Sequence, residues 1–158
     1  MSERDRLRMS EEEVEALVDE CWRAQVATFN PDGSAHLVPL SLMRFDGHVA
    51  FWTDPASQKV MNLRRDPRIT CLIETGTRFE DFRAVQITGR AAVIDDLETS
   101  ARAGETLFAR HNGGLSDDLK AYVAGLAPNR VVIVVEPERV VSWDHRKLAG
   151  VRPDEIGT

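Results

Sequence analysis

Two tight-turn signals near the start of the chain separate three short runs of β-forming residues, and this spacing constrains the fold more than any other feature. Asn-Pro-Asp-Gly occupies residues 30–33, between runs at 22–29 and 36–43. Phe-Asp-Gly at 45–47 then leads into a third run, 48–53. Gly accepts a positive φ, and Asn, Pro and Asp are typical of turns. Strands joined by such short turns pair antiparallel, so the pattern predicts a three-stranded meander.

Further strands follow in the second half of the chain. Residues 68–74 alternate apolar and polar side chains, and 82–94 form a longer run that Gly89 interrupts, which predicts a bulge or bend. The runs 130–136 and 139–143 predict a last strand pair hinged at Pro137. Six or seven mostly antiparallel strands favour closure into a barrel, which buries one face and removes open edges.

Helices are expected between these strands rather than in place of them. Ser10 and Glu13 form a capping-box pattern, which predicts a helix over about 11–21. Asp54 as N-cap and Pro55 at the first helical position predict another over 56–65. Two more helical regions are expected after the long strand, one from about residue 99 and one over 116–126. The fold class is therefore mainly β with peripheral helices.

The length and charge of the chain limit its class. A chain of 158 residues suits one domain, expected over 1–148, followed by a polar tail at 149–158. The net charge of −6 argues against broad binding to nucleic acid or to an anionic membrane. The charged start resembles no signal peptide, and no apolar run reaches the length of a membrane helix. Cys21 and Cys71 have no metal-like or disulfide spacing, so a cytoplasmic protein is expected.

The strands carry apolar residues toward both faces of the predicted sheet. A barrel interior accounts for one face only, so the outer face needs another cover. A second copy of the chain is the simplest cover, and a homodimer is therefore expected.

The motifs of hydrolases, metal enzymes and nucleotide-binding folds do not occur in the sequence. There is no G-x-S-x-G, no paired-histidine metal spacing, no Walker loop and no G-x-G-x-x-G after the first strand. No metal is expected, and no catalytic residue can be assigned.

The segment 51–67 is the most informative part of the sequence, because a strand leads directly into a helix start there. A helix N-terminus presents free N–H groups and a partial positive charge, which suit a phosphate. Ser57 adds a hydroxyl and Lys59 an ammonium group. The alternative is that both are solvated helix residues, since a single Ser-x-Lys is a weak motif.

This segment resembles the Ser-x-Lys…Asn-Leu…Asp-Pro pattern of the pyridoxamine-phosphate-oxidase-like, FMN-binding split-barrel superfamily. Within that superfamily it is closest to the branch of flavin- and deazaflavin-dependent oxidoreductases. Three more pieces agree in order: the strand 36–41 with a proline inside it, Val-Gln-Ile-Thr-Gly-Arg-Ala at 85–91, and Ser-Trp-Asp-His-Arg-Lys-Leu at 142–148. The resemblance spans about residues 10–148.

The resemblance implies an antiparallel split β-barrel that works as a homodimer, with its cofactor, coenzyme F420 or FMN, in a groove between subunits. Residues 36–41 would run beside the ring, Trp52 and Thr53 would border it, and Ser57, Gln58 and Lys59 would hold the phosphate. Trp143 of the partner subunit would flank the ring, although a core or interface role is equally open to it. Pro39 fits a strand beside a ring or a plain sheet edge. The implied cofactor-binding set is His36, Val38, Pro39, Leu40, Ser41, Trp52, Thr53, Ser57, Gln58, Lys59 and Trp143.

Three functions follow from the resemblance. Oxidases of the superfamily often have Arg-Lys where this chain has Gln58-Lys59, which favours hydride transfer from reduced F420 to a small unsaturated acceptor. The first alternative is an FMN-dependent oxidase or reductase, although the C-terminal arginine motif for pyridoxal-type substrates is not evident. The second is a protein that binds a flavin or a tetrapyrrole without turnover.

Overall fold

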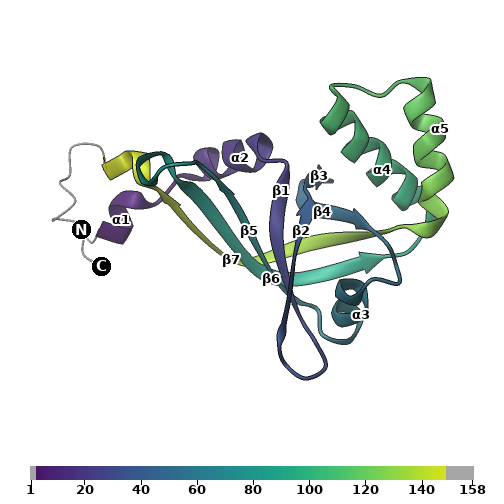
Figure 1. Ribbon diagram of the computed structural model, residues 1–158, viewed down its shortest axis with the longest axis horizontal. Coiled ribbons are helices and arrows are strands. Elements are labelled where there is room, and N and C mark those ends of the chain that lie inside the picture. The colour runs from purple at the N-terminus through teal and green to yellow at the C-terminus, as the bar shows by residue number, and fades with distance from the viewer. Residues whose placement is uncertain (1–2, 149–158) are drawn as a thin grey trace.

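The computed structural model describes residues 3–148 and consists of seven strands and five α-helices (Figure 1). The strands are β1 (Arg23–Phe29), β2 (Ala35–Ser41), β3 (Met43–Phe45), β4 (His48–Thr53), β5 (Arg68–Thr75), β6 (Arg83–Ile94) and β7 (Val131–Asp144). The helices are α1 (Glu3–Leu7), α2 (Glu11–Glu20), α3 (Gln58–Arg65), α4 (Leu97–Asn112) and α5 (Asp117–Leu126). Short 3₁₀ turns lie at Phe79–Asp81, Ala127–Asn129 and His145–Leu148. The predicted tail at 149–158 lies outside the described residues.

All seven strands form one antiparallel sheet in the order β2-β1-β5-β6-β7-β4-β3. The sheet curls so that β2 and β4, which are far apart in this order, contact each other without pairing. This is the mainly β split-barrel architecture that the resemblance implied. No helix among residues 3–148 is long and apolar enough to span a membrane.

The predicted meander of three strands is wrong in one respect. β1 and β2 pair as expected across the turn at 30–33, but the predicted run 36–43 is divided between β2 and β3, and β2 does not pair with β4. At Leu42, whose side chain is fully buried, the chain leaves β1 and crosses to the other end of the sheet, where β3 pairs with β4. Anchoring one large apolar side chain in the core at the corner makes this crossing favourable.

The last strand pair is in fact one continuous strand. β7 pairs with β6 along its whole length, from Val132 opposite Ile94 to Asp144 opposite Arg83. The expected irregularity at Gly89 is present as a β-bulge, where Glu138 of β7 is left without a partner in the register. A Cβ on Gly89 would lie 2.0 Å from the carbonyl oxygen of Glu136, so only glycine fits this close approach.

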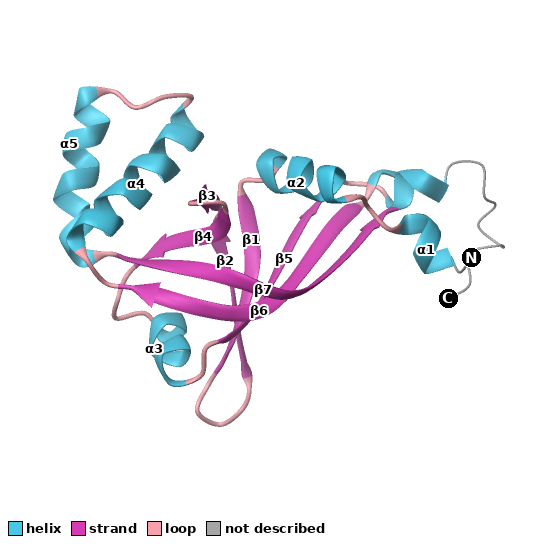
Figure 2. Ribbon diagram, turned by 180° about the vertical axis from the view of Figure 1, so that it is seen from behind, coloured by secondary structure: helices cyan, strands magenta, loops and turns pink. Residues whose placement is uncertain are grey.

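Two apolar clusters hold the sheet. The larger cluster fills the concave side and includes Val26, Phe51, Ile69, Cys71 and Ile133, all less than 2% exposed. Cys71 is a fully buried member of this cluster, and burial raises the pKa of its thiol to about 12. The smaller cluster lies on the other face, where α4 covers β3, β4 and the start of β7 (Figure 2).

The helix α2 begins as predicted. Ser10 Oγ accepts a hydrogen bond from the Glu13 N–H, and the Glu13 carboxylate accepts one from the Ser10 N–H, which completes the capping box. Leu17 and Val18 on its buried side pack against the larger cluster.

Candidate functional site

The β2 residues of the predicted site divide between the two faces of the sheet. His36, Val38 and Leu40 lie opposite buried residues of β1 and are partly buried on the concave side. Pro39 and Ser41 point to the outer face and are exposed. β2 is the terminal strand of the sheet, so its far edge has no neighbouring strand. Pro39 therefore costs no hydrogen bond there, and a sheet edge by itself accounts for it.

The two β4 residues of the set also point in opposite directions. Thr53 is buried on the concave side, next to the start of the loop to α3. Trp52 points outward into the smaller cluster. Its ring meets that of Phe108 of α4 edge-on, with 6.2 Å between the ring centroids, and lies beneath the guanidinium of Arg130. The structure therefore places Trp52 among the α4 residues and not with Thr53.

The start of α3 differs from its prediction. The helix begins at Gln58 with Ser57 as N-cap, and not at Ala56 with Asp54 as cap. Asp54 instead accepts a hydrogen bond from the Ala56 N–H at 2.7 Å, which makes a turn before the helix. The Ser57 hydroxyl donates to the Asp54 carbonyl oxygen at 2.8 Å and does not cap the helix. The first N–H groups of α3 therefore remain open to an external acceptor.

Lys59 lies in the first turn of α3 and is partly buried. Burial lowers the pKa of its ammonium group, although the negative charge of Asp54 acts in the opposite direction. Within residues 3–148, no carboxylate forms an ion pair with Lys59. A desolvated cation without a counterion is a favourable partner for an anionic ligand.

Asn62 has a structural role in this region that the sequence did not reveal. Its side chain is fully buried, and its Nδ2 donates to Thr28 Oγ1 at 3.1 Å and to Asn30 Oδ1 at 3.0 Å. Its Oδ1 accepts from the side-chain amide of Gln58 at 2.9 Å. Asn62 thereby fixes α3 to β1 and the turn after it. The sequence signal that could have indicated this role is a polar residue placed between Val60 and Leu63, which are both buried.

The Gln58 side chain is consequently occupied inside the chain. Its amide donates to Asn62, so what Gln58 offers an anion is its backbone N–H. The groups at the start of α3 that can hold a phosphate are thus two backbone N–H groups and the Lys59 ammonium, with the Ser57 hydroxyl next to them. These residues fit the phosphate of an FMN- or F420-type cofactor.

Trp143 lies far from this cluster within one chain. It stands near the C-terminal end of β7, on the outer face, with its ring centroid 6.5 Å from that of Phe82. α3 is at the opposite end of the sheet (Figure 1). The fold of one chain therefore brings β2, Thr53 and the α3 start into one region and leaves Trp52 and Trp143 outside it. Residues 3–148 contain no group of three or more His, Cys, Asp or Glu that could hold a metal ion.

Comparison with known proteins gives a family match over most of the chain. Residues 10–144 match the family described as pyridoxamine 5'-phosphate oxidase. A conserved hypothetical protein from Mycobacterium tuberculosis has a similar structure, with a TM-score of 0.88 and 34% identity over 100% of this chain and 98% of that one. A search among curated proteins found no match.

More distant structures share the fold. An F420 reductase superposes with a TM-score of 0.63 and 21% identity, over 80% of this chain and 94% of its own. A haem storage protein from Vibrio cholerae superposes with a TM-score of 0.63 and 13% identity, over 86% and 97% of the two chains. At these identities the likeness extends to the fold alone.

Proposed function

The chain belongs to the pyridoxamine 5'-phosphate oxidase family, and on this basis we propose that it is a flavin- or deazaflavin-dependent oxidoreductase, with reduced coenzyme F420 as its hydride donor. The observation that carries the proposal is the start of α3. Open backbone N–H groups there lie beside Lys59, an ammonium group that is partly buried and has no carboxylate partner within residues 3–148.

The choice of F420 over FMN depends on Gln58. Oxidases that this segment resembles often carry an arginine at that position, and here the side chain is neutral and bound to Asn62. A single cation at the phosphate, supported by backbone N–H groups, is closer to the deazaflavin branch. The bound cofactor would supply a hydride, which carries both electrons, and the acceptor would take its second hydrogen as a proton from water.

In this proposal, the role of the chain's own residues is to bind the cofactor and to orient it toward the acceptor. Lys59 and the first turn of α3 would hold the phosphate, and His36, Val38 and Leu40 on the concave side of β2 would face the ring. Thr53 supplies a short polar side chain between the two. Orientation of two reacting partners accounts for much of such catalysis, so a marked acid–base pair is not required.

The proposal includes a homodimer, in which the partner subunit's Trp143 flanks the ring. The outer face of the sheet supports this, since exposed apolar side chains such as that of Leu37, which is 64% exposed, lie there. Contact with a second copy would bury these apolar side chains. Light scattering should give twice the chain mass, and a monomer at micromolar concentration would contradict the shared site.

The first experiment is a fluorescence titration of the purified protein with F420 and, separately, with FMN. Saturable binding of F420 together with its oxidation in the presence of an acceptor is expected. Tight FMN binding and a yellow protein would favour the FMN-dependent alternative. Binding of neither would contradict the proposed function.

Binding without turnover is the second candidate. The side chains of His36 and Lys59, which are the ionisable groups of the proposed site, take part in no hydrogen bond within residues 3–148, so no proton-transfer pair is in place. Tight cofactor binding with no redox reaction for any donor and acceptor pair would favour this function.

A further inference from the structure

A pocket of about 630 Å³ lies between α1 and the C-terminal half of β7, at the other end of the sheet from α3. Beyond the bulge β7 pairs with β6 alone, because β4 pairs only with residues 131–134. One edge of residues 139–143 is therefore open toward α1. The pocket has the size of a site for a small molecule.

The floor of the pocket is apolar and exposed. Val140 is 44% exposed and Val141 is 38% exposed, and Trp143 lies beside them. Val141 and Trp143 point to the outer face and, together with Leu7 of α1, give the pocket an apolar lining for a planar ligand, whereas Val140 points to the concave side.

The rim of the pocket is cationic, with Arg4 and Arg8 from α1 and its C-terminal end and Arg139 from β7. Seven other arginines of the described chain form ion pairs with carboxylates. No ion pair involves these three within residues 3–148. One aspartate, Asp5, also lines the pocket and has an interaction of its own. Three guanidinium groups against one carboxylate favour an anion, in a chain whose net charge is −6.

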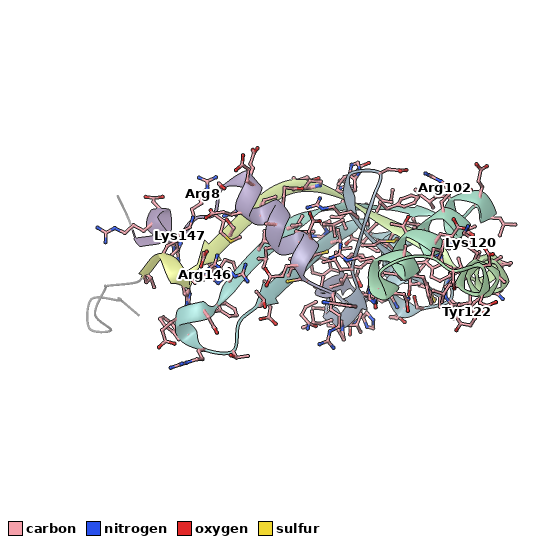
Figure 3. The ribbon with its side chains drawn as sticks, turned by 90° about the horizontal axis from the view of Figure 1, so that it is seen from above. Arg8, Arg102, Lys120, Tyr122, Arg146 and Lys147 are labelled. Atoms are coloured by element: carbon pink, nitrogen blue, oxygen red, sulfur yellow. The ribbon has the colours of Figure 1, made fainter. Side chains whose placement is uncertain are left out.

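Hydrogen bonds to the rest of the chain hold the backbone around Arg8, on the α1 side of the cationic rim, in place. Met9 N–H donates to Ser142 Oγ at 3.1 Å, which ties the segment after α1 to β7. Lys147 Nζ donates to the Arg8 carbonyl oxygen at 2.8 Å and to the Glu13 carboxylate at 2.6 Å. Arg8 and Lys147 lie together at this end, far from Arg102 and Tyr122 (Figure 3).

We propose that this pocket binds an apolar, planar molecule that carries an anionic group, and that this molecule is the hydride acceptor of the enzyme. The assignment of this molecule as the hydride acceptor rests on the proposed function, because Trp143 is the residue that would flank the ring held by the partner subunit. An acceptor bound over Val141 and Trp143 would then lie next to that ring. The arginines would select an acidic acceptor over a neutral one.

Binding is tested with two dyes that differ in one anionic group, 8-anilinonaphthalene-1-sulfonate and neutral N-phenyl-1-naphthylamine. The sulfonate should bind and quench tryptophan fluorescence. The Arg8→Gln/Arg139→Gln double variant should weaken sulfonate binding at least tenfold and binding of the neutral dye less than twofold. Arg90→Gln is the control, since Arg90 is exposed, lies outside the pocket and forms no ion pair within residues 3–148. Equal loss for both dyes, or none, would overturn the site.

The acceptor is tested with 1,4-naphthoquinone and its 2-sulfonate, by following the oxidation of reduced F420 on the loaded protein. The sulfonate should have the higher kcat/KM, and the double variant should lose that preference at least tenfold while keeping its affinity for F420. Sulfonate dye binding without any preference among acceptors would overturn the acceptor assignment alone. Dye binding in a protein that binds neither F420 nor FMN would leave the pocket in place and contradict the proposed function.

Discussion

The indole Nε1–H of Trp52 donates a 2.9 Å hydrogen bond to Ser100 Oγ, which joins β4 to α4 just before the chain turns toward α3. The Ser100 hydroxyl is fully buried and lies within 3.0 Å of the Ala127 carbonyl oxygen and 3.1 Å of that of Arg130. One hydroxyl thus links α4, the end of α5 and the start of β7 to a single tryptophan. Trp52 is therefore a fixed part of the scaffold beneath α4.

Substitution of Gly104 should separate α4 from this tryptophan. A Cβ on Gly104 would lie 2.6 Å from Val123 Cγ1 and 2.8 Å from Trp52 Cζ2, so Gly104→Ala overpacks the contact. We expect a loss of about 1–3 kcal/mol in the free energy of unfolding, measured by urea denaturation. Gly125→Ala is the matched control, because nothing lies within 4 Å of its Cβ. It should stabilise the protein by about 0.5–1 kcal/mol through helix propensity. Equal effects at the two glycines would contradict the packing argument.

Asn62→Ala should loosen α3 from β1. The substitution leaves the buried Thr28 hydroxyl and the Gln58 amide without their partner, at a cost of about 1–3 kcal/mol in the free energy of unfolding. Because Gln58 and Lys59 begin the same helix, cofactor affinity should fall as well. Asn129→Ala, an exposed residue, should change stability by less than about 0.5 kcal/mol. Wild-type affinity in a destabilised Asn62→Ala protein would mean that α3 holds its position without this network.

Lys59→Ala should weaken binding of the phosphate-bearing cofactor. Loss of one charge-assisted hydrogen bond corresponds to about 1.5–3 kcal/mol, which is roughly a ten- to hundredfold rise in Kd. Fluorescence titration measures this directly. Lys120→Ala, on the exposed side of α5, removes the same charge elsewhere and should leave Kd unchanged. An unchanged Kd in the Lys59 variant would make Lys59 a solvated helix residue, as the weak motif allowed.

Cofactor affinity should begin to fall at a pH below the usual pKa of a lysine side chain. Burial lowers the pKa of Lys59 below its usual 10.5 in the free protein, and a bound phosphate would raise it again. Binding is therefore coupled to proton uptake once the pH exceeds the lowered pKa, and Kd rises with pH from that point. Titrations between pH 7 and 10 should show this rise in the wild type. Lys59→Arg, which stays charged, should not show it; the same rise in both proteins would exclude Lys59 as the titrating group.

Much of the fold could be predicted because its signals are local. The turns at 30–33 and 45–47, the capping box at Ser10 and the bulge at Gly89 depend on neighbouring residues, and the structure has all of them. The crossing of the chain at Leu42 could not be predicted, because strand order depends on contacts between distant segments. The same applies to β7, where Pro137 suggested a break that the bulge absorbs.

The same distinction between local signals and contacts of distant segments applies to the candidate site. His36 to Ser41 and Ser57 to Lys59 are near one another in sequence, and the resemblance gave their order. The opposite directions of Trp52 and Thr53 follow from the alternation of a strand, but which face α4 covers does not. The pocket between α1 and β7 joins residues about 130 positions apart, so no sequence pattern could indicate it.

The bulge in β7 has a consequence for which side of the molecule Trp143 serves. Val131, Ile133 and Val135 are buried in the concave side before the bulge, whereas Val140 and Ser142 lie toward that side after it. Glu138 is the one extra residue that shifts the odd-numbered positions from the inside to the outside. Deleting Glu138 would place Arg139 directly after Pro137, so the strand would alternate without a break while Arg139, Val141 and Trp143 kept their partners on β6 and their outward side. Glu138 thus marks the point where a buried half of β7 gives way to an exposed half, while the strand stays paired with β6 on both sides of it.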